Sequence, residues 1–287
     1  LKFQNFGEHL PEQPPAAPFT AEVGELPAAY DAEHYGAQGL NGRFLQDDAL
    51  QFFAGTSSSG SPTCCSGSFG GKFEDPQQRE IARSEVHAAI TREFRKHGIG
   101  IEQDKLKCGA RLIDVGAGTG LFLETFARLV GSTGHVRAID ITPPFVDFMR
   151  ERVRSVIDPE LRDRIAVSLC TPTSTCLNDT DAPPPGGDYD AAFICDVYHH
   201  FEYPKTFMAS LRDALRPGGI VLLIDFYRDP DKMVTHDPQW ALSHLRAGRH
   251  EFLLEILGTG GFELIAMPDL EGLLAENYCL VFKRREE

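Results

Sequence analysis

The segment Cys195-Asp-Val-Tyr-His-His-Phe201 gathers four side chains that can carry protons or bind ligands. Imidazole groups titrate near neutral pH, so His199 or His200 can take a proton from a hydroxyl or an amine. Tyr198 is a further catalytic candidate because a phenol can donate or accept a hydrogen bond. Adjacent residues after a strand point in different directions, so we expect one histidine to act and the other to orient the loop.

Two apolar runs, 190–195 and 220–225, have the length of buried strands. In an open parallel sheet, ligands bind beyond the carboxyl ends of the strands. Asp196 and Asp225 follow or end these runs. We therefore expect both carboxylates to face one cleft, with Asp225 near the substrate.

A glycine-rich turn follows a third apolar run, 111–115. Gly116, Gly118 and Gly120 alternate there, and glycine permits backbone angles that other residues avoid and lets a ligand approach main-chain N–H groups. Asp140 ends the next apolar run about twenty residues later, where an acid can accept hydrogen bonds from ribose hydroxyls. This combination predicts a nucleoside site.

The sequence Asp114-Val-Gly-Ala-Gly-Thr-Gly120 resembles the first motif of class I S-adenosylmethionine-dependent methyltransferases. Dinucleotide-binding proteins have the spacing G-x-G-x-x-G instead, which disfavours a nicotinamide oxidoreductase. The Tyr-His-His-Phe form is similar to a D-x-Y-H-H-F segment of bacterial small-molecule methyltransferases. The resemblance implies S-adenosyl-L-methionine as the cofactor and a small-molecule methyl acceptor. It implies cofactor contacts from Asp114, Gly116, Ala117, Gly118, Gly120, Asp140, Ile141 and Asp196.

Alternating strands and helices predict an α/β fold from about residue 108 onward. The resemblance, which covers roughly residues 108–284, implies a three-layer Rossmann-like arrangement whose seven-stranded sheet is mostly parallel, with an antiparallel final strand. Leu215-Arg-Pro-Gly-Gly219 is similar to a turn of this superfamily that precedes the fifth strand. The expected strands are 111–115, 136–140, 165–169, 190–195, 220–225, 262–267 and 277–284, and the expected helices are 119–130, 143–156, 204–215 and 248–258.

Three regions precede or make up the expected domain. Residues 1–71 combine a proline-containing extended arm with a Ser/Gly-rich loop, residues 72–107 hold a covering helix, and residues 108–287 form the cofactor-binding domain. In this superfamily such covering segments help to form the substrate pocket. The residues that could contribute to it are Tyr30, His34, Tyr35, Arg43 and Arg79.

The net charge of −14 disfavours nucleic acid as a partner, because binding it relies on clustered lysine and arginine. No apolar run reaches the roughly twenty residues of a membrane span.

Seven scattered cysteines predict reduced thiols in a cytoplasm-like compartment. The chain begins at Leu1 with no charged and apolar leader, so a targeting segment is expected to be removed or never present. The oligomeric state is left open.

Trp240 to His250 lie where the superfamily often places part of a substrate lid. His244 could assist catalysis there, and Arg246 could hold an anionic acceptor; the alternative is a solvated helix start. Asp196 and Asp225 are similar in position to the Mg²⁺ ligands of catechol-type O-methyltransferases. Those enzymes have Asn after the second acid, whereas this chain has Phe226, so we assign no metal.

Two further alternatives stay open. Soft thiolates bind arsenic and similar metalloids, so a metalloid or thiol methyltransferase is possible. The fold also allows a non-catalytic module that binds a nucleoside without turnover. The turn Leu169-Cys-Thr-Pro172 lacks the acid that often binds adenine, so that contact is unassigned. The cysteines that would serve the thiol alternative are Cys64, Cys65, Cys170, Cys176 and Cys195.

Overall fold

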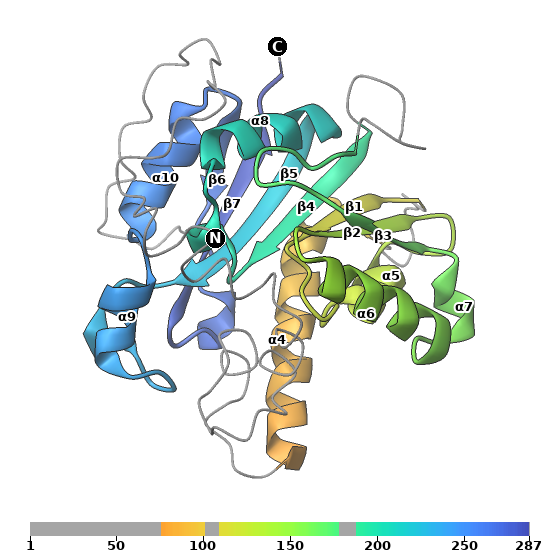
Figure 1. Cartoon of the computed structure of the whole chain (residues 1–287), viewed down its shortest axis with the longest axis horizontal. Helices are drawn as coiled ribbons and strands as arrows, with labels where there is room; N and C mark the ends of the chain where they lie inside the picture. The colour runs from red at the N-terminus through yellow and green to blue at the C-terminus, as the bar shows by residue number, and fades with distance from the viewer. Residues whose placement is uncertain (1–75, 101–108, 178–187, 287) are drawn as a thin grey trace, which may run out of the picture.

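In the computed structural model of the chain, the described residues are 76–100, 109–177 and 188–286. Seven strands form one sheet in the order β3-β2-β1-β4-β5-β7-β6 (Figure 1). The strands are β1 (Arg111–Val115), β2 (His135–Asp140), β3 (Ile165–Leu169), β4 (Tyr189–Cys195), β5 (Leu215–Phe226), β6 (Phe262–Ala266) and β7 (Asn277–Arg284).

The strands β3, β2, β1, β4 and β5 are parallel to one another, whereas β7 is antiparallel to both β5 and β6. The predicted fold class, a mostly parallel seven-stranded α/β sheet with an antiparallel last strand, is therefore confirmed. Because the chain order places β1 beside β4, the strand order reverses next to β1. The carboxyl ends of these two strands lie at such a switch point, where open α/β sheets bind ligands.

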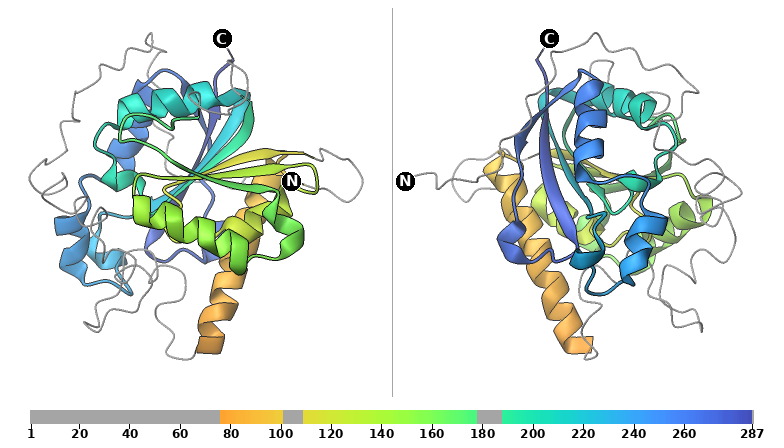
Figure 2. Two further views of the ribbon diagram at one scale, coloured as in Figure 1. Left: turned by 45° about the vertical axis from the view of Figure 1, so that its right-hand side comes forward. Right: turned by 90° about the vertical axis from the view of Figure 1, so that its left-hand side faces the viewer.

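Helices cover both faces of the sheet, as the two views of Figure 2 show. Ile113 and Val115 of β1 pack with α8 and α10, whereas Leu112 packs with α4, α5 and α6, as the alternation of side chains along a strand requires. The helices are α4 (Pro76–Lys96), α5 (Leu123–Leu129), α6 (Pro143–Ser155), α7 (Pro159–Arg162), α8 (Pro204–Ala214), α9 (Pro238–His244) and α10 (Arg249–Gly258), with short 3-10 turns η1 (Tyr198–His200), η2 (Pro230–Lys232) and η3 (Leu270–Gly272).

An aromatic cluster joins the covering helix α4 to the sheet. The ring of Phe193, on β4, lies 4.9 Å from Phe122, 5.1 Å from Phe126 and 6.1 Å from Phe94, centroid to centroid, with steep interplanar angles. Such edge-to-face contacts add to the stabilisation that burial alone provides. The covering helix is thus fixed against the same strand whose end carries the histidines.

The structure differs from the sequence prediction in two places. Helix α5 begins at Leu123 rather than at 119, because the glycine loop continues further. The sequence 215–219 is not a turn before β5 but belongs to that strand, where the pairing with β4 shifts between Tyr189 and Ala191. The covering helix predicted within residues 72–107 is present as α4.

Other expectations fall outside this part of the chain. The arm and loop predicted for residues 1–71 lie outside the described residues, and so do four of the five suggested pocket residues, Tyr30, His34, Tyr35 and Arg43. The fifth, Arg79, lies on α4, but its side chain is not described.

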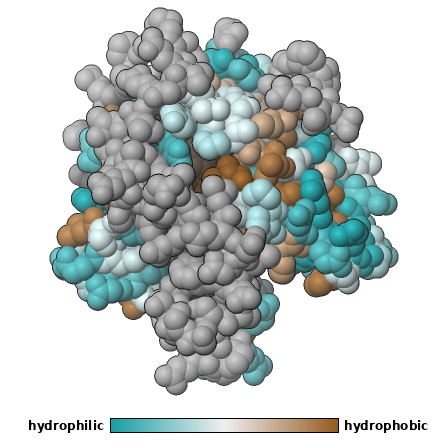
Figure 3. Space-filling view, in the orientation of Figure 1, coloured by the Kyte–Doolittle hydropathy of each residue, from teal (hydrophilic) through white to brown (hydrophobic). Residues whose placement is uncertain are grey.

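Across residues 76–100, 109–177 and 188–286, no helix combines the length and apolar character that crossing a bilayer requires. Apolar residues gather near the middle of the face shown in Figure 3.

Replacing Phe193 with alanine should lower the free energy of unfolding by about 3–5 kcal/mol, because its fully buried ring would leave a cavity among three aromatic neighbours. Urea denaturation measures this change. Phe148, which is 37% exposed, supplies the matched control, and Phe148→Ala should cost less than about 1 kcal/mol. Equal losses for the two variants would contradict the packing role of Phe193.

Candidate active site

A pocket opens beyond the carboxyl ends of β1, β2 and β4. It encloses roughly 930 Å³ of space between atoms, part of which is open solvent. Its wall combines the glycine loop, the end of β2, the turn after β3 and the segment after β4. The lining residues are Val115, Gly116, Gly118, Thr119, Asp140, Ile141, Thr142, Phe145, Cys170, Thr171, Pro172, Asp196, Val197, His200, Phe201, Glu202 and Phe207.

The glycines of the loop have different surroundings. Gly118 has φ +56°, and a Cβ placed on it would meet nothing within 4 Å, so the space beside it belongs to the pocket. A Cβ on Gly120 would lie 2.5 Å from Leu123 Cδ1, which means that this glycine is required for packing against α5. Gly120 and Ala117 do not line the pocket. Of the predicted cofactor residues in the loop, Gly116 and Gly118 are the two at its wall.

Asp140 connects the end of β2 to the glycine loop. Its Oδ2 accepts a hydrogen bond from the Gly118 N–H at 2.9 Å, and its Oδ1 accepts one from the Thr142 N–H at 2.9 Å. Burial raises the pKa of this carboxyl, and the hydrogen bonds oppose that shift. A carboxylate has about four lone-pair sites, so Asp140 keeps acceptor capacity for a ligand hydroxyl at the pocket wall.

Asp114 lies behind the loop and does not line the pocket. Burial, followed by the nearby charge of Asp140, raises the pKa of Asp114 to about 7. Its Oδ2 is buried and has no hydrogen-bond partner among the described residues. A cation beside this carboxyl would favour its charged form.

Asp196 and Ile141 complete the predicted cofactor set, and both lie at the pocket wall. Asp196 has φ +54°, a conformation that residues with a side chain rarely adopt and that is concentrated at functional sites. Its Oδ1 accepts a hydrogen bond of 2.7 Å from Asn277 Nδ2 on β7. The side chain is therefore held in place from β7, which lies on the other side of β5 from β4.

Asp225 does not contact the pocket but holds His199. Both side chains are fully buried, and Asp225 Oδ1 lies 2.7 Å from His199 Nδ1. Its Oδ2 also accepts the backbone N–H of His199 at 3.1 Å. We expected Asp225 to bind the substrate; the structure places it against His199 rather than at the pocket wall. His200, the next residue, does line the pocket.

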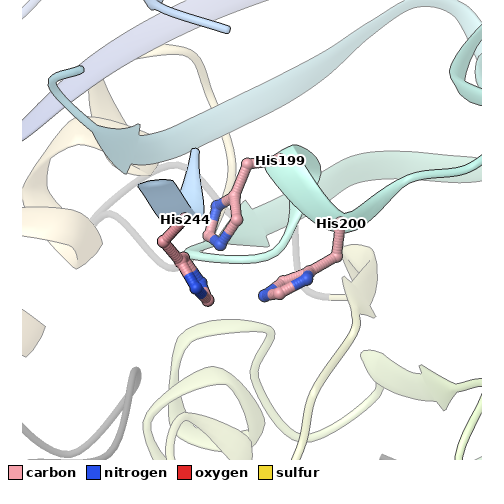
Figure 4. A group of neighbouring side chains, drawn as sticks. All are labelled: His199, His200 and His244. Atoms are coloured by element: carbon pink, nitrogen blue, oxygen red, sulfur yellow. The ribbon is translucent and has the colours of Figure 1, made fainter. Parts of the chain in front are cut away.

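His244 joins these two histidines from α9, as Figure 4 shows. Its ring centroid lies 5.2 Å from that of His199 and 5.2 Å from that of His200. The sequence prediction placed all three in one site, and the structure brings them together. The arrangement can accept a proton or provide imidazole ligands.

Tyr198 and Arg246 are both held away from the pocket wall by Glu255. Arg246 donates to both oxygens of Glu255, at 3.0 and 2.8 Å, and its guanidinium lies over the ring of Phe252. Tyr198 donates its hydroxyl to Glu255 at 2.8 Å, and burial raises the pKa of this tyrosine well above its usual value. The catalytic role expected for Tyr198 and the anion-binding role expected for Arg246 therefore receive no support from this geometry.

One of the cysteines named for the thiol alternative, Cys170, lies at the pocket. Cys170 is at the wall, and burial raises the pKa of its thiol well above the usual value, so the thiol is protonated at neutral pH. Cys195 and Cys176 are partly exposed and do not line the pocket. Cys64 and Cys65 lie outside the described residues. The described cysteines do not favour the thiol-based alternative.

Sequence reasoning missed several apolar and hydroxyl residues of the wall. Phe145 follows the end of β2 by five residues, and Phe207 lies on α8, so neither belongs to a motif. A signal existed for Phe145, because residues directly after a strand end lie near the cleft. The turn from Cys170 to Pro172, which the sequence left without a role, also lines the pocket.

Residues 113–221 match a family model described as "Methyltransferase domain". This methyltransferase-domain match extends from β1 into β5 and thus includes the glycine loop, Asp140 and the paired histidines. Among curated proteins, the chain is 26% identical over 165 residues to a ubiquinone biosynthesis O-methyltransferase of Cereibacter sphaeroides, covering 57% of this chain and 61% of that protein. It is 25% identical over 126 residues to the ubiquinone/menaquinone biosynthesis C-methyltransferase UbiE of Ralstonia pickettii, covering 44% and 47%.

The matches span about half to three fifths of the length of these curated relatives. Among solved structures, a SAM-dependent methyltransferase from Aquifex aeolicus has a TM-score of 0.52 at 20% identity, covering 75% of this chain and 95% of that one. The [4+2]-cyclase SpnF has a TM-score of 0.57 at 18% identity, covering 91% and 99%. The fold of this chain is therefore the Rossmann-like fold of S-adenosylmethionine-dependent methyltransferases.

The segment that carries His244 is anchored by Glu276. Glu276 Oε2 lies 2.8 Å from His236 Nδ1, and the same carboxylate accepts the backbone N–H groups of Val234 and Thr235. Burial raises the pKa of Glu276, but the hydrogen bonds from His236 and Thr235 outweigh it and hold the pKa at about 2. The ring of His236 stacks on Trp240, 4.2 Å away, and Trp240 stacks on His244 at 4.5 Å.

Glu276→Gln should destabilise the protein at neutral pH by roughly 3 kcal/mol, because the carboxylate's pKa falls from 4.5 to about 2 on folding. A depressed pKa contributes stability above the unfolded value, and that contribution is lost as pH falls through the folded value. The difference between wild type and variant should thus shrink between pH 5 and pH 2. Urea denaturation at several pH values measures it.

The exposed Glu151, which pairs with Arg154 on the surface of α6, supplies the control. Glu151→Gln should change the stability by less than about 1 kcal/mol at every pH, since exposed ion pairs contribute little. A constant difference between wild type and Glu276→Gln across this pH range would contradict the role assigned to the carboxylate.

Proposed function

We propose that this protein is an S-adenosylmethionine-dependent methyltransferase that acts on a small-molecule acceptor. The observation that carries the proposal is the pocket at the switch point of the sheet, where Gly118 and Asp140 meet within the methyltransferase-domain match. The net charge of −14 favours a small molecule over a nucleic acid.

The residues of the pocket fit this cofactor. Gly118 leaves open space where a side chain would otherwise project, so that a ligand can approach the backbone. Asp140 has lone pairs left for ribose hydroxyls, and Phe145 and Ile141 add apolar wall. When bound, S-adenosylmethionine supplies an electrophilic methyl group on a positively charged sulfur. The buried carboxyls of Asp114 and Asp196 would stabilise a cationic ligand in this region.

The histidine cluster is the proposed place where the acceptor loses its proton. His200 is the member at the pocket wall, so it is assigned to that step. His199 is fully buried and hydrogen-bonded to Asp225, which suits it to orient the cluster. These residues would hold the acceptor in line with the methyl group, and such alignment supplies much of the rate in displacement reactions. The attacking atom can be oxygen, nitrogen, carbon or sulfur.

Gly118→Ala should weaken S-adenosylmethionine binding by more than about tenfold, because the new Cβ would occupy the approach to the loop. Calorimetric titration of the full chain with the cofactor measures the affinity. Gly98 offers a matched control, since it also has a positive φ, +81°, and open space for a Cβ, but it lies outside the pocket wall. Gly98→Ala should bind normally.

Titration with NAD and with S-adenosylhomocysteine in parallel tests the cofactor class. Equal affinity of wild type and Gly118→Ala for S-adenosylmethionine, with Gly98→Ala unchanged, would count against the assigned site. Cofactor binding without product formation across a broad acceptor panel would favour a non-catalytic nucleoside-binding module.

His200→Gln should reduce kcat by roughly a hundredfold or more, since general base catalysis typically contributes that much. Cofactor affinity should stay within about twofold of wild type, because Asp140 and the glycine loop are untouched. S-adenosylhomocysteine release is followed with a panel of hydroxyl, thiol, amine and activated-carbon acceptors. The exposed His250, on α10, gives the control variant His250→Gln, which should retain full activity. An unchanged kcat in His200→Gln would remove this residue from the mechanism.

A further inference from the structure

The three histidines of the site converge more closely than proton transfer alone requires. One ring nitrogen from each of His199, His200 and His244 lies within 4.8 Å of the other two. They come from two separate elements, since η1 supplies two and the end of α9 supplies the third. Figure 4 shows their rings pointing toward a common space.

His199 presents a buried nitrogen to this space. Its Nδ1 lies 2.7 Å from Asp225, and a carboxylate can only accept, so Nδ1 carries the proton and Nε2 is left as a lone-pair acceptor. Nε2 is buried and has no hydrogen-bond partner among the described residues. An unpaired buried polar atom costs free energy, and a bound ion would offset that cost.

Asp225 provides the carboxylate that a metal-binding histidine usually has behind it. Histidines that bind metals usually donate their other ring N–H to a carboxylate or a carbonyl, which fixes the tautomer and raises the basicity of the ligand. Asp225 is fully buried, and it accepts backbone N–H groups from His199 at 3.1 Å and from Phe226 at 2.8 Å. The carboxylate is thus rigidly placed behind the imidazole.

The third histidine is oriented by stacking. Trp240 lies parallel to His244, with an interplanar angle of 19° and a centroid distance of 4.5 Å. The ring of His236 also stacks on the ring of Trp240, with a centroid distance of 4.2 Å, and His236 is itself held by Glu276. The chain Glu276, His236, Trp240 therefore limits the rotation of the His244 ring.

We propose that His199, His200 and His244 bind a divalent transition-metal ion, with Zn²⁺ as the best fit. Three neutral imidazoles suit zinc and its neighbours in the transition series, whereas Mg²⁺ and Ca²⁺ require oxygen ligands. In a tetrahedral zinc site with Zn–N distances of about 2.0–2.1 Å, the ligand nitrogens lie about 3.3 Å apart. The 4.8 Å limit observed here means that the rings close by at most roughly 1.5 Å on binding.

Three protein ligands leave a fourth coordination position open, as in catalytic zinc sites. His200 belongs to both the cluster and the pocket wall, so the ion lies beside the cleft. Resting on the proposed function, the open position takes a hydroxyl or thiol acceptor as its anion. The ion lowers the acceptor's pKa, and the released proton passes to water. With the ion bound, the ligating nitrogen of His200 has no free lone pair, so the ion rather than the imidazole lowers the proton affinity of the acceptor; His200 acts as a general base only in the metal-free protein.

The test uses the full chain without an affinity tag, freed of metal by a chelator and titrated calorimetrically with Zn²⁺. We expect one ion per chain, with an affinity that falls by more than about a hundredfold in His200→Gln and in His244→Gln. Co²⁺ binding, followed by its visible absorption, should show a four-coordinate spectrum. Asp225→Asn should weaken binding by roughly 10–100-fold while keeping one ion per chain, as expected for a residue that only positions a ligand.

His250→Gln, on the exposed side of α10, should bind Zn²⁺ as wild type does. Circular dichroism and thermal unfolding check that each variant is folded. Because His200→Gln and His244→Gln are separate variants, the test remains possible if one of them does not fold. Absence of stoichiometric binding to wild type, or equal affinity in His200→Gln, His244→Gln and His250→Gln, overturns the proposal. The same samples are also titrated with S-adenosylmethionine, and this measurement is independent of the metal. If the wild-type protein binds Zn²⁺ but not the cofactor, the proposed function is refuted and the metal site is not.

Discussion

The hydrogen bond from the Gly118 N–H to Asp140 is the interaction on which the site depends. It joins the loop after β1 to the end of β2, and the second oxygen of the same carboxylate holds the backbone of Thr142, where α6 begins. One side chain thus fixes three pieces of backbone around the pocket. Because this carboxylate is buried, it is stable only while these N–H groups remain in place.

Carboxyl groups recur at the same edge of the sheet. Asp114, Asp140, Asp196 and Asp225 are all buried, on or just after β1, β2, β4 and β5 respectively. Removing carboxylates from water is costly, and hydrogen bonds offset the cost at Asp140, Asp196 and Asp225. Asp114 is left with an unpaired oxygen and a pKa of about 7. Such an edge favours cationic ligands, which include a sulfonium and a divalent ion.

Much of the fold could be predicted because its signals are local. The apolar runs fixed the strands within a few residues, and the distance from the glycine loop to Asp140 follows from the length of one helical crossover. The positions of the Arg246 and Tyr198 side chains could not be predicted from local patterns. Both contact Glu255, and that contact depends on how α10 packs beside α8 and β6, which no local pattern encodes.

The sequence prediction included His244 in the site, but the position of its ring depends on the contacts that Glu276 makes with the loop after β5, which the sequence does not reveal. The two halves of the pocket are nevertheless mechanically joined. A Cβ on Gly116 would lie 2.7 Å from Val197 Cγ2, so the glycine loop packs directly on the residue that precedes η1. The loop and the turn that carries His199 and His200 are therefore packed against each other. Binding on one side of the pocket is therefore coupled through van der Waals contact to the imidazole geometry on the other.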